Sequence, residues 1–219
     1  MIFFPGASIP FSFRSRSPKT CLQFKITLLH VHPHVWRRIQ VPRNYTFWDF
    51  HVAISDCMGW LDCHLHEFLV VNPLTGKEDH IGMPDPDDDF DEDEVLTGWK
   101  TRISTCFTSK NRRGIYLYDF GDGWEHEVIR EGKYPMEEGV QYPRCIDGKR
   151  ACPPEDAGGS DGYQEFLRIL RNPKHREYQE RLDWAEAQTG QKPFDPERFS
   201  PSEVHFDDPD ERWQTAYQA

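Results

Sequence analysis

Short segments in which apolar and polar residues alternate recur along the first two thirds of the chain. A period of two is typical of half-buried β-strands. The alternation is clearest over 22–28, where Leu22, Phe24, Ile26 and Leu28 are spaced two apart. Similar but shorter patterns predict further strands over 35–41, 64–72, 115–119 and 124–130, with a hairpin partner ending near residue 81.

Helical spacing replaces this alternation early in the chain. Thr46 is a suitable N-cap, Asp49 follows it by three residues, and apolar residues 47, 50, 54 and 58 share one face. Gly59 is a natural stop for this helix because glycine tolerates the left-handed conformation at a helix end.

Two more helices are expected near the C-terminus. Ser160 or Asp161 is predicted to cap the first, and Asn172 with Pro173 to open a second that reaches Gly190. Strands therefore come early and helices late, without βαβ alternation. The pattern predicts an α+β fold, with a mostly antiparallel sheet, an early helix and a C-terminal helical pair packed on it.

The chain has 219 residues, which suits one large domain or one domain with appendages. Its formal charge is -11, but the acidic segment 85–94 carries eight acidic residues and no basic one, so the remainder has -11 + 8 = -3. This balance favours a protein partner over nucleic acid.

No apolar stretch is long enough to span a bilayer, so no membrane partner is expected. Six cysteines in 219 residues are too few for a disulfide scaffold, which favours the cytoplasm.

The stretch "YDFGDGWEHEV" combines acidic residues, a histidine and two glycines between strand-like segments. Asp122-Gly123 is typical of a two-residue hairpin turn. That turn would place Asp119 directly opposite His126, whereas a three-residue loop would place His126 opposite Tyr118.

An Asp119–His126 pair has two interpretations. The carboxylate would orient the imidazole and raise its basicity, as a general base or metal ligand requires. Asp122 or Glu125 would then serve nearby as acid, base or ligand. The pair could equally be a structural contact between two strands.

A metal site is the second candidate chemistry. His64 and His66 are two apart on a predicted strand and would project to one face, where His126 could join them around Zn²⁺. Cys145 and Cys152 form another possible ligand pair, although six intervening residues exceed the usual spacing in zinc knuckles. The alternatives are structural histidines and two packed thiols.

Several motifs, taken in order, resemble those of the Ri-plasmid ORF-3-like family, whose members are often described as TnpR-like, transposon-associated proteins. They are "FKITLLHVHPHVWRRIQVP", "CMGW", "HLHEF", "YLYDFGDGWEHEV", "CIDGKRACPPEDAGG" and "GYQEFL". "YDFGDGWEH" followed by "CPPED" is the most specific part. The resemblance covers roughly residues 21–206, which it implies are a single domain, and it leaves residues 1–20 as an N-terminal extension and 207–219 as a C-terminal tail. It implies a compact α+β domain associated with mobile elements, and it implies no reaction.

The sequence is compatible with two functions, and no motif decides whether the chain is an enzyme. The first is an uncharacterised accessory or binding module of mobile-element type. A basic groove around Trp36, Arg37 and Arg38 would favour nucleic acid as its partner, and an exposed apolar patch would favour a protein. The second is a metal-dependent, hydrolase-like enzyme centred on the Asp119–His126 pair.

Overall fold

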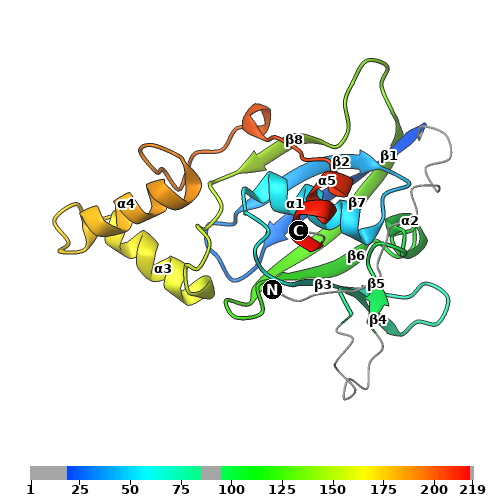
Figure 1. Ribbon diagram of the computed structural model, residues 1–219, viewed down its shortest axis with the longest axis horizontal. Helices are drawn as coiled ribbons and strands as arrows, with labels where there is room; N and C mark the ends of the chain where they lie inside the picture. Colours follow the sequence, from blue (N-terminus) through cyan, green and yellow to red (C-terminus); the bar gives the residue numbers. More distant parts are fainter. Residues whose placement is uncertain (1–18, 85–94, 218–219) are drawn as a thin grey trace.

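The computed structural model describes residues 19–84 and 95–217, and its largest element is an eight-stranded sheet (Figure 1). The strands are β1 (Thr20–Leu28), β2 (Trp36–Pro42), β3 (His66–Val71), β4 (Glu78–Gly82), β5 (Leu96–Thr97), β6 (Arg113–Tyr118), β7 (Trp124–Pro135) and β8 (Arg144–Lys149). Their order is β5-β4-β3-β6-β7-β1-β2-β8, and every neighbouring pair is antiparallel apart from β4 and β5. The predicted antiparallel sheet is confirmed.

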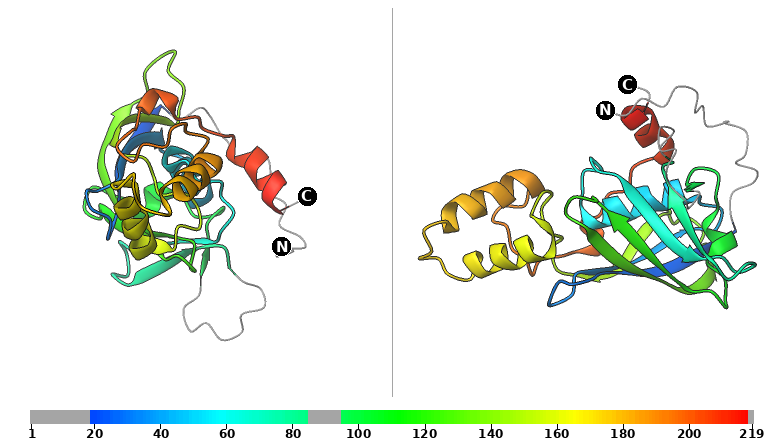
Figure 2. Two further views of the ribbon diagram at one scale, coloured as in Figure 1. Left: turned by 90° about the vertical axis from the view of Figure 1, so that its left-hand side faces the viewer. Right: turned by 90° about the horizontal axis from the view of Figure 1, so that it is seen from below.

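Helix α1 (Phe47–Met58) crosses one face of the sheet (Figures 1 and 2). It begins at the predicted cap: the Asp49 N–H donates to the Thr46 hydroxyl at 3.1 Å, and the Thr46 N–H donates to the Asp49 carboxylate at 2.9 Å. This reciprocal capping box satisfies two amides that the helix itself leaves without partners. Gly59 ends the helix at φ 94°, as predicted.

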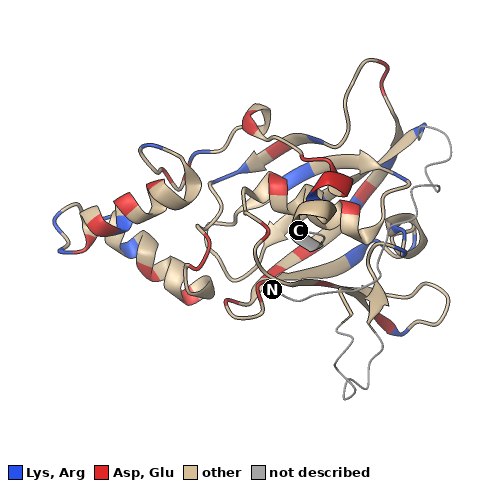
Figure 3. Ribbon diagram, viewed as in Figure 1, with Lys and Arg blue, Asp and Glu red and all other residues tan. Residues whose placement is uncertain are grey.

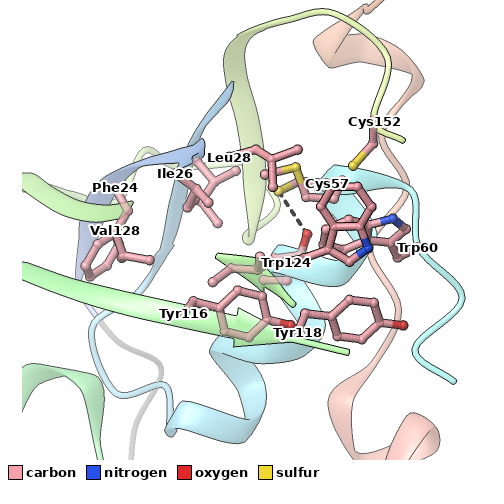
Figure 4. Close-up of a cluster of buried hydrophobic side chains, with 14 of the residues drawn as sticks. Phe24, Ile26, Leu28, Cys57, Trp60, Tyr116, Tyr118, Trp124, Val128 and Cys152 are labelled. Carbon is pink, nitrogen blue, oxygen red and sulfur yellow. Dashed lines mark hydrogen bonds between the residues drawn. The ribbon is translucent and has the colours of Figure 1, made fainter. Parts of the chain in front are cut away.

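The core lies between α1 and the sheet, and Figure 4 shows part of it. Alternate residues of β1, β6 and β7 point into it: Phe24, Ile26, Leu28, Tyr116, Tyr118, Trp124 and Val128. Aromatic rings extend the core to the end of β6, where Trp60 stacks on Tyr118 with ring centroids 4.7 Å apart. This packing holds the segment after α1 against the sheet.

The C-terminal helical pair, α3 (Gly159–Leu170) and α4 (Tyr178–Thr189), extends beyond one end of the sheet (Figure 2). Its buried residues Tyr163, Phe166 and Ala185 are continuous with the main core. The α+β fold with a C-terminal helical pair is therefore confirmed. No helix in the described ranges has the length and apolar character needed to cross a bilayer.

Helix α5 (Pro209–Tyr217) follows the 3₁₀ turn η1 (Pro201–Glu203) and lies within the segment expected to be a tail. It packs on α1 through Trp213, whose ring centroid is 5.0 Å from that of Trp48 and 5.1 Å from that of Trp99. The indole N–H of Trp48 also donates to the Pro209 carbonyl at 2.9 Å. The side of α1 facing away from the sheet is thereby covered.

Several boundaries differ from prediction. Strand β8 and the short helix α2 (Ile103–Cys106) were not predicted. Gly158 occupies the N-cap of α3 in place of Ser160 or Asp161, and α4 begins at Tyr178 because the residues after Asn172 form turns. The acidic segment 85–94 and residues 1–18 of the expected extension lie outside the described residues.

Candidate functional site

Three loops meet at the end of the sheet beside α3 (Figure 1). They are residues 59–65 between α1 and β3, residues 119–123 between β6 and β7, and residues 150–158 before α3; we call them the three-loop junction. The Asp119 N–H donates to the Leu65 carbonyl at 2.9 Å. The Leu61 N–H donates to the Glu155 carboxylate at 2.8 Å. Glu155 of the segment "CPPED" therefore holds the loop that follows α1.

The turn 119–123 owes its shape to aspartate and glycine. Asp119 adopts φ 55°, and its carboxylate accepts the Gly121 N–H at 3.0 Å. Asp122 reaches the third loop, where its carboxylate accepts the Gly158 N–H at 3.0 Å. Gly159 is required beside this contact: its φ is 66°, and an added Cβ would lie 2.5 Å from the Asp122 carbonyl oxygen.

His64 lies at the centre of the junction and faces carboxylates from the other two loops, where acidic positions gather (Figure 3). Its Nε2 is 3.4 Å from Asp156 Oδ1, 3.6 Å from Asp119 Oδ2 and 3.9 Å from Glu155 Oε2. The Asp119 and Glu155 side chains are 9% and 5% exposed, whereas that of Asp156 is 69% exposed. The cluster therefore has a buried floor and one side open to solvent.

Glu155 is the most deeply held member of the cluster. Its Oε1 accepts the Leu61 N–H and the Tyr118 hydroxyl, the latter at 3.0 Å. Its Oε2 is buried and has no hydrogen-bond partner among the described residues, and the same is true of His64 Nε2. Burial raises the pKa of Glu155, although both donors and His64 oppose this rise. Burial also raises the pKa of Tyr118, which keeps its hydroxyl a donor.

Two groups in the described part of the chain have the spacing of metal ligands, and His64 belongs to both. One consists of Cys63, His64 and Glu155, and the other of His64, Asp119 and Asp156. Within each group the candidate ligand atoms lie within 4.8 Å of one another. An imidazole with several carboxylates can hold a divalent cation or orient a proton donor.

The predicted Asp119–His126 pair is wrong. Tyr118 pairs with Trp124 and Tyr116 with His126, so the turn contains five residues instead of two or three. His126 is fully buried in the core, and its Nδ1 lies 3.2 Å from the Tyr116 carbonyl oxygen. Burial lowers the pKa of His126 to about 4. It is a neutral core residue, and Asp119 instead faces His64.

The structure does not bring the five expected metal ligands together. His64 lies in the loop before β3, while the buried His66 ring stacks on His51 with centroids 3.4 Å apart. Cys145 lies on β8, and Cys152 is buried, which raises the pKa of its thiol. Neither metal-like group in the described residues includes His66, His126, Cys145 or Cys152.

The remaining predicted residues have structural partners. Glu125 lies on the exposed face of β7 with its carboxylate 3.3 Å from His30. Asp122 joins two loops, as described above. Arg38 pairs with Glu131 at 2.8 Å. Arg37 is 1% exposed and donates to the Cys57 carbonyl at the end of α1. Both arginines beside Trp36 are therefore engaged within the protein.

Sequence reasoning missed Cys63, Glu155 and Asp156 as site residues. A signal for the last two was available in "CPPEDAGG", where two acidic residues stand between a pair of prolines and a pair of glycines. Such a segment forms a tight, restricted loop that can present acidic side chains in fixed directions. Nothing in the sequence indicates that this loop meets His64.

Comparison with known proteins identifies relatives of the whole fold. Residues 20–203 match the sequence model described as "Plasmid pRiA4b ORF-3-like protein". The uncharacterized protein y4hQ of Sinorhizobium fredii (strain NBRC 101917 / NGR234) is 34% identical over 163 residues, covering 74% of this chain and 79% of that protein. The crystal structure of MM3350, a protein of unknown function from Methanosarcina mazei Go1, has 43% sequence identity and a TM-score of 0.78, covering 87% of this chain and 100% of that chain.

Proposed function

The chain belongs to the plasmid pRiA4b ORF-3-like family, and we propose that it is an accessory binding module that docks a protein segment at the three-loop junction. The observation that carries this proposal is a set of exposed apolar side chains. Leu61, Leu65 and Phe120 are 66%, 41% and 58% exposed, and all three belong to the junction. Exposed apolar groups gathered at one place are typical of interaction surfaces.

The negative charge of the junction favours a partner segment that carries basic residues. Asp119, Asp122, Glu155 and Asp156 lie in the same loops as the exposed apolar residues. A segment that presents apolar side chains together with a lysine or arginine would complement both features. The family description names a plasmid protein, which supports an accessory role associated with mobile elements.

At the surface around Trp36, Arg37 and Arg38, the contacts of the two arginines favour a protein partner over nucleic acid. Arg37 is buried, and Arg38 is paired with Glu131. Neither guanidinium is therefore presented to a phosphate backbone. The strand register separates Asp119 from His126, which argues against an enzyme centred on that pair.

Selection from a random peptide library against the full chain tests the proposal. We expect enrichment of peptides with apolar and basic residues, and at least about tenfold weaker binding to a Leu61→Asp, Phe120→Asp double variant. Leu74→Asp is the matched control, because Leu74 is 94% exposed in the turn between β3 and β4. Equal binding to both variants, or no enrichment of apolar and basic residues, would contradict the proposal.

A further inference from the structure

We infer that the three-loop junction is a binding site for one divalent metal ion, with Zn²⁺ the best match, held by Cys63, His64 and Glu155. Cys63 and His64 lie in the loop before β3 and Glu155 lies in the loop before α3, so the ion would join two segments that are far apart in the sequence. The site shares its location with the proposed docking surface. The two proposals share the acidic side chains of the junction, but metal binding is measured without a peptide, so each proposal is tested separately.

The first support is a pair of buried atoms without partners. Glu155 is 5% exposed, and its Oε2 points toward His64 Nε2 at 3.9 Å. Neither atom has a hydrogen-bond partner among the described residues. A buried carboxylate oxygen without a partner is costly, since it has lost water and gained nothing in return. A cation between Glu155 and His64 would satisfy both atoms at once.

The distances give the second support. A protonated His64 would donate a charge-assisted hydrogen bond of about 2.7–2.9 Å to one carboxylate. The three observed separations from Nε2 are instead 3.4, 3.6 and 3.9 Å. Zn²⁺ bonds of about 2.0–2.2 Å in tetrahedral geometry separate the ligand atoms by about 3.3–3.6 Å. The Nε2–Oε2 separation of 3.9 Å between His64 and Glu155 is therefore closer to that of two zinc ligands than to that of a hydrogen-bonded ion pair.

The local charge gives the third support. Asp119, Glu155 and Asp156 converge on His64, and His64 is the only basic side chain in the described ranges that lies within ion-pair distance of any of them. Three carboxylates around one imidazole leave negative charge in a partly buried place, where it is poorly compensated. A divalent ion would offset most of that charge.

The donor set selects among the metals. Ca²⁺ and Mg²⁺ prefer oxygen donors alone, whereas an imidazole nitrogen suits Zn²⁺ and other transition metals. Cys63 adds a thiol whose sulfur lies within 4.8 Å of the His64 and Glu155 donor atoms. A soft donor at this position biases the site further toward Zn²⁺.

Calorimetric titration of the chelator-treated full chain with Zn²⁺, Ca²⁺ and Mg²⁺ tests the inference, with elemental mass spectrometry for stoichiometry. We expect one Zn²⁺ per chain, at least tenfold weaker Ca²⁺ and Mg²⁺ binding, and a Zn²⁺-dependent rise in Tm. His64→Gln and Glu155→Gln should weaken Zn²⁺ binding at least 100-fold. His30→Gln should leave it unchanged, because His30 faces only Glu125 at the surface.

Cys63→Ser keeps the test decisive if the buried variants fail to fold, since the Cys63 side chain is exposed. Its Zn²⁺ affinity should fall at least tenfold while its circular dichroism spectrum is retained. No stoichiometric Zn²⁺ in the wild-type chain would overturn the inference, and so would unchanged Zn²⁺ affinity in the folded Cys63→Ser and His64→Gln variants. Neither result would change the peptide binding expected at Leu61 and Phe120, so the metal proposal can be refuted while the docking proposal stands.

Discussion

Replacing Gly159 with alanine should destabilise the protein because two penalties act at the same residue. Its φ of 66° lies in the left-handed region, where an L-residue costs about 1–2 kcal/mol. The new Cβ would also lie 2.5 Å from the Asp122 carbonyl oxygen. One of the two loops must then move, and overpacking of this kind costs about 1–3 kcal/mol. The free energy of unfolding should therefore fall by about 2–5 kcal/mol.

Gly190→Ala is the matched control for this substitution. Gly190 has a similar φ of 69°, but an added Cβ would meet nothing within 4 Å. It should lose only the conformational part, about 1–2 kcal/mol. Urea unfolding followed by tryptophan fluorescence measures both variants. If Gly159→Ala is no more destabilising than Gly190→Ala, the close approach between the turn 119–123 and the start of α3 is refuted.

Three further outcomes follow from buried side chains. The pKa of His126 is about 4 in the folded protein against an ordinary value of 6.5, so the unfolded chain takes up the proton first as the pH falls. The free energy of unfolding should therefore drop by about 3 kcal/mol from pH 7 to pH 4. His126→Phe should remove this pH dependence in urea titrations. Arg37→Met should lower the free energy of unfolding by about 1–3 kcal/mol in the same assay, because it leaves the buried Cys57 carbonyl without its donor. A smaller loss than in Arg38→Met would contradict this. Trp213→Ala should lose about 3–5 kcal/mol of packing against Trp48, measured by thermal unfolding, and unchanged Tm would show that α5 does not stabilise the core.

Local patterns determined the elements whose ends are set by neighbouring residues. The alternation over 22–28 predicted β1, and Thr46, Asp49 and Gly59 predicted both ends of α1. These predictions succeeded because capping and strand alternation depend on contacts within a few residues. Strand β8 was missed because its pairing with β2 comes from a distant part of the chain.

The β6–β7 hairpin shows where local reasoning failed. Asp122-Gly123 favours a two-residue turn, but Asp119 adopts the left-handed region and the Gly123 N–H bonds to its carbonyl at 2.6 Å. The turn is therefore five residues long, and His126 shifts to face Tyr116. The turn is held in this form by contacts to Leu65 and to the start of α3, which are not visible in the motif.

The sequence alone determined the fold class, the first helix and most of the strands, because hydrophobic periodicity and capping are local signals. It also indicated His64 and Asp119 as candidate site residues, although not Glu155 or Asp156. Only the tertiary structure decided which of them meet. His64 and Glu155 are 91 positions apart, and the packing of Trp60 on Tyr118 with the Leu61–Glu155 hydrogen bond brings them together. No periodicity or spacing records a contact between loops so far apart, since that contact depends on how the whole sheet and α1 pack.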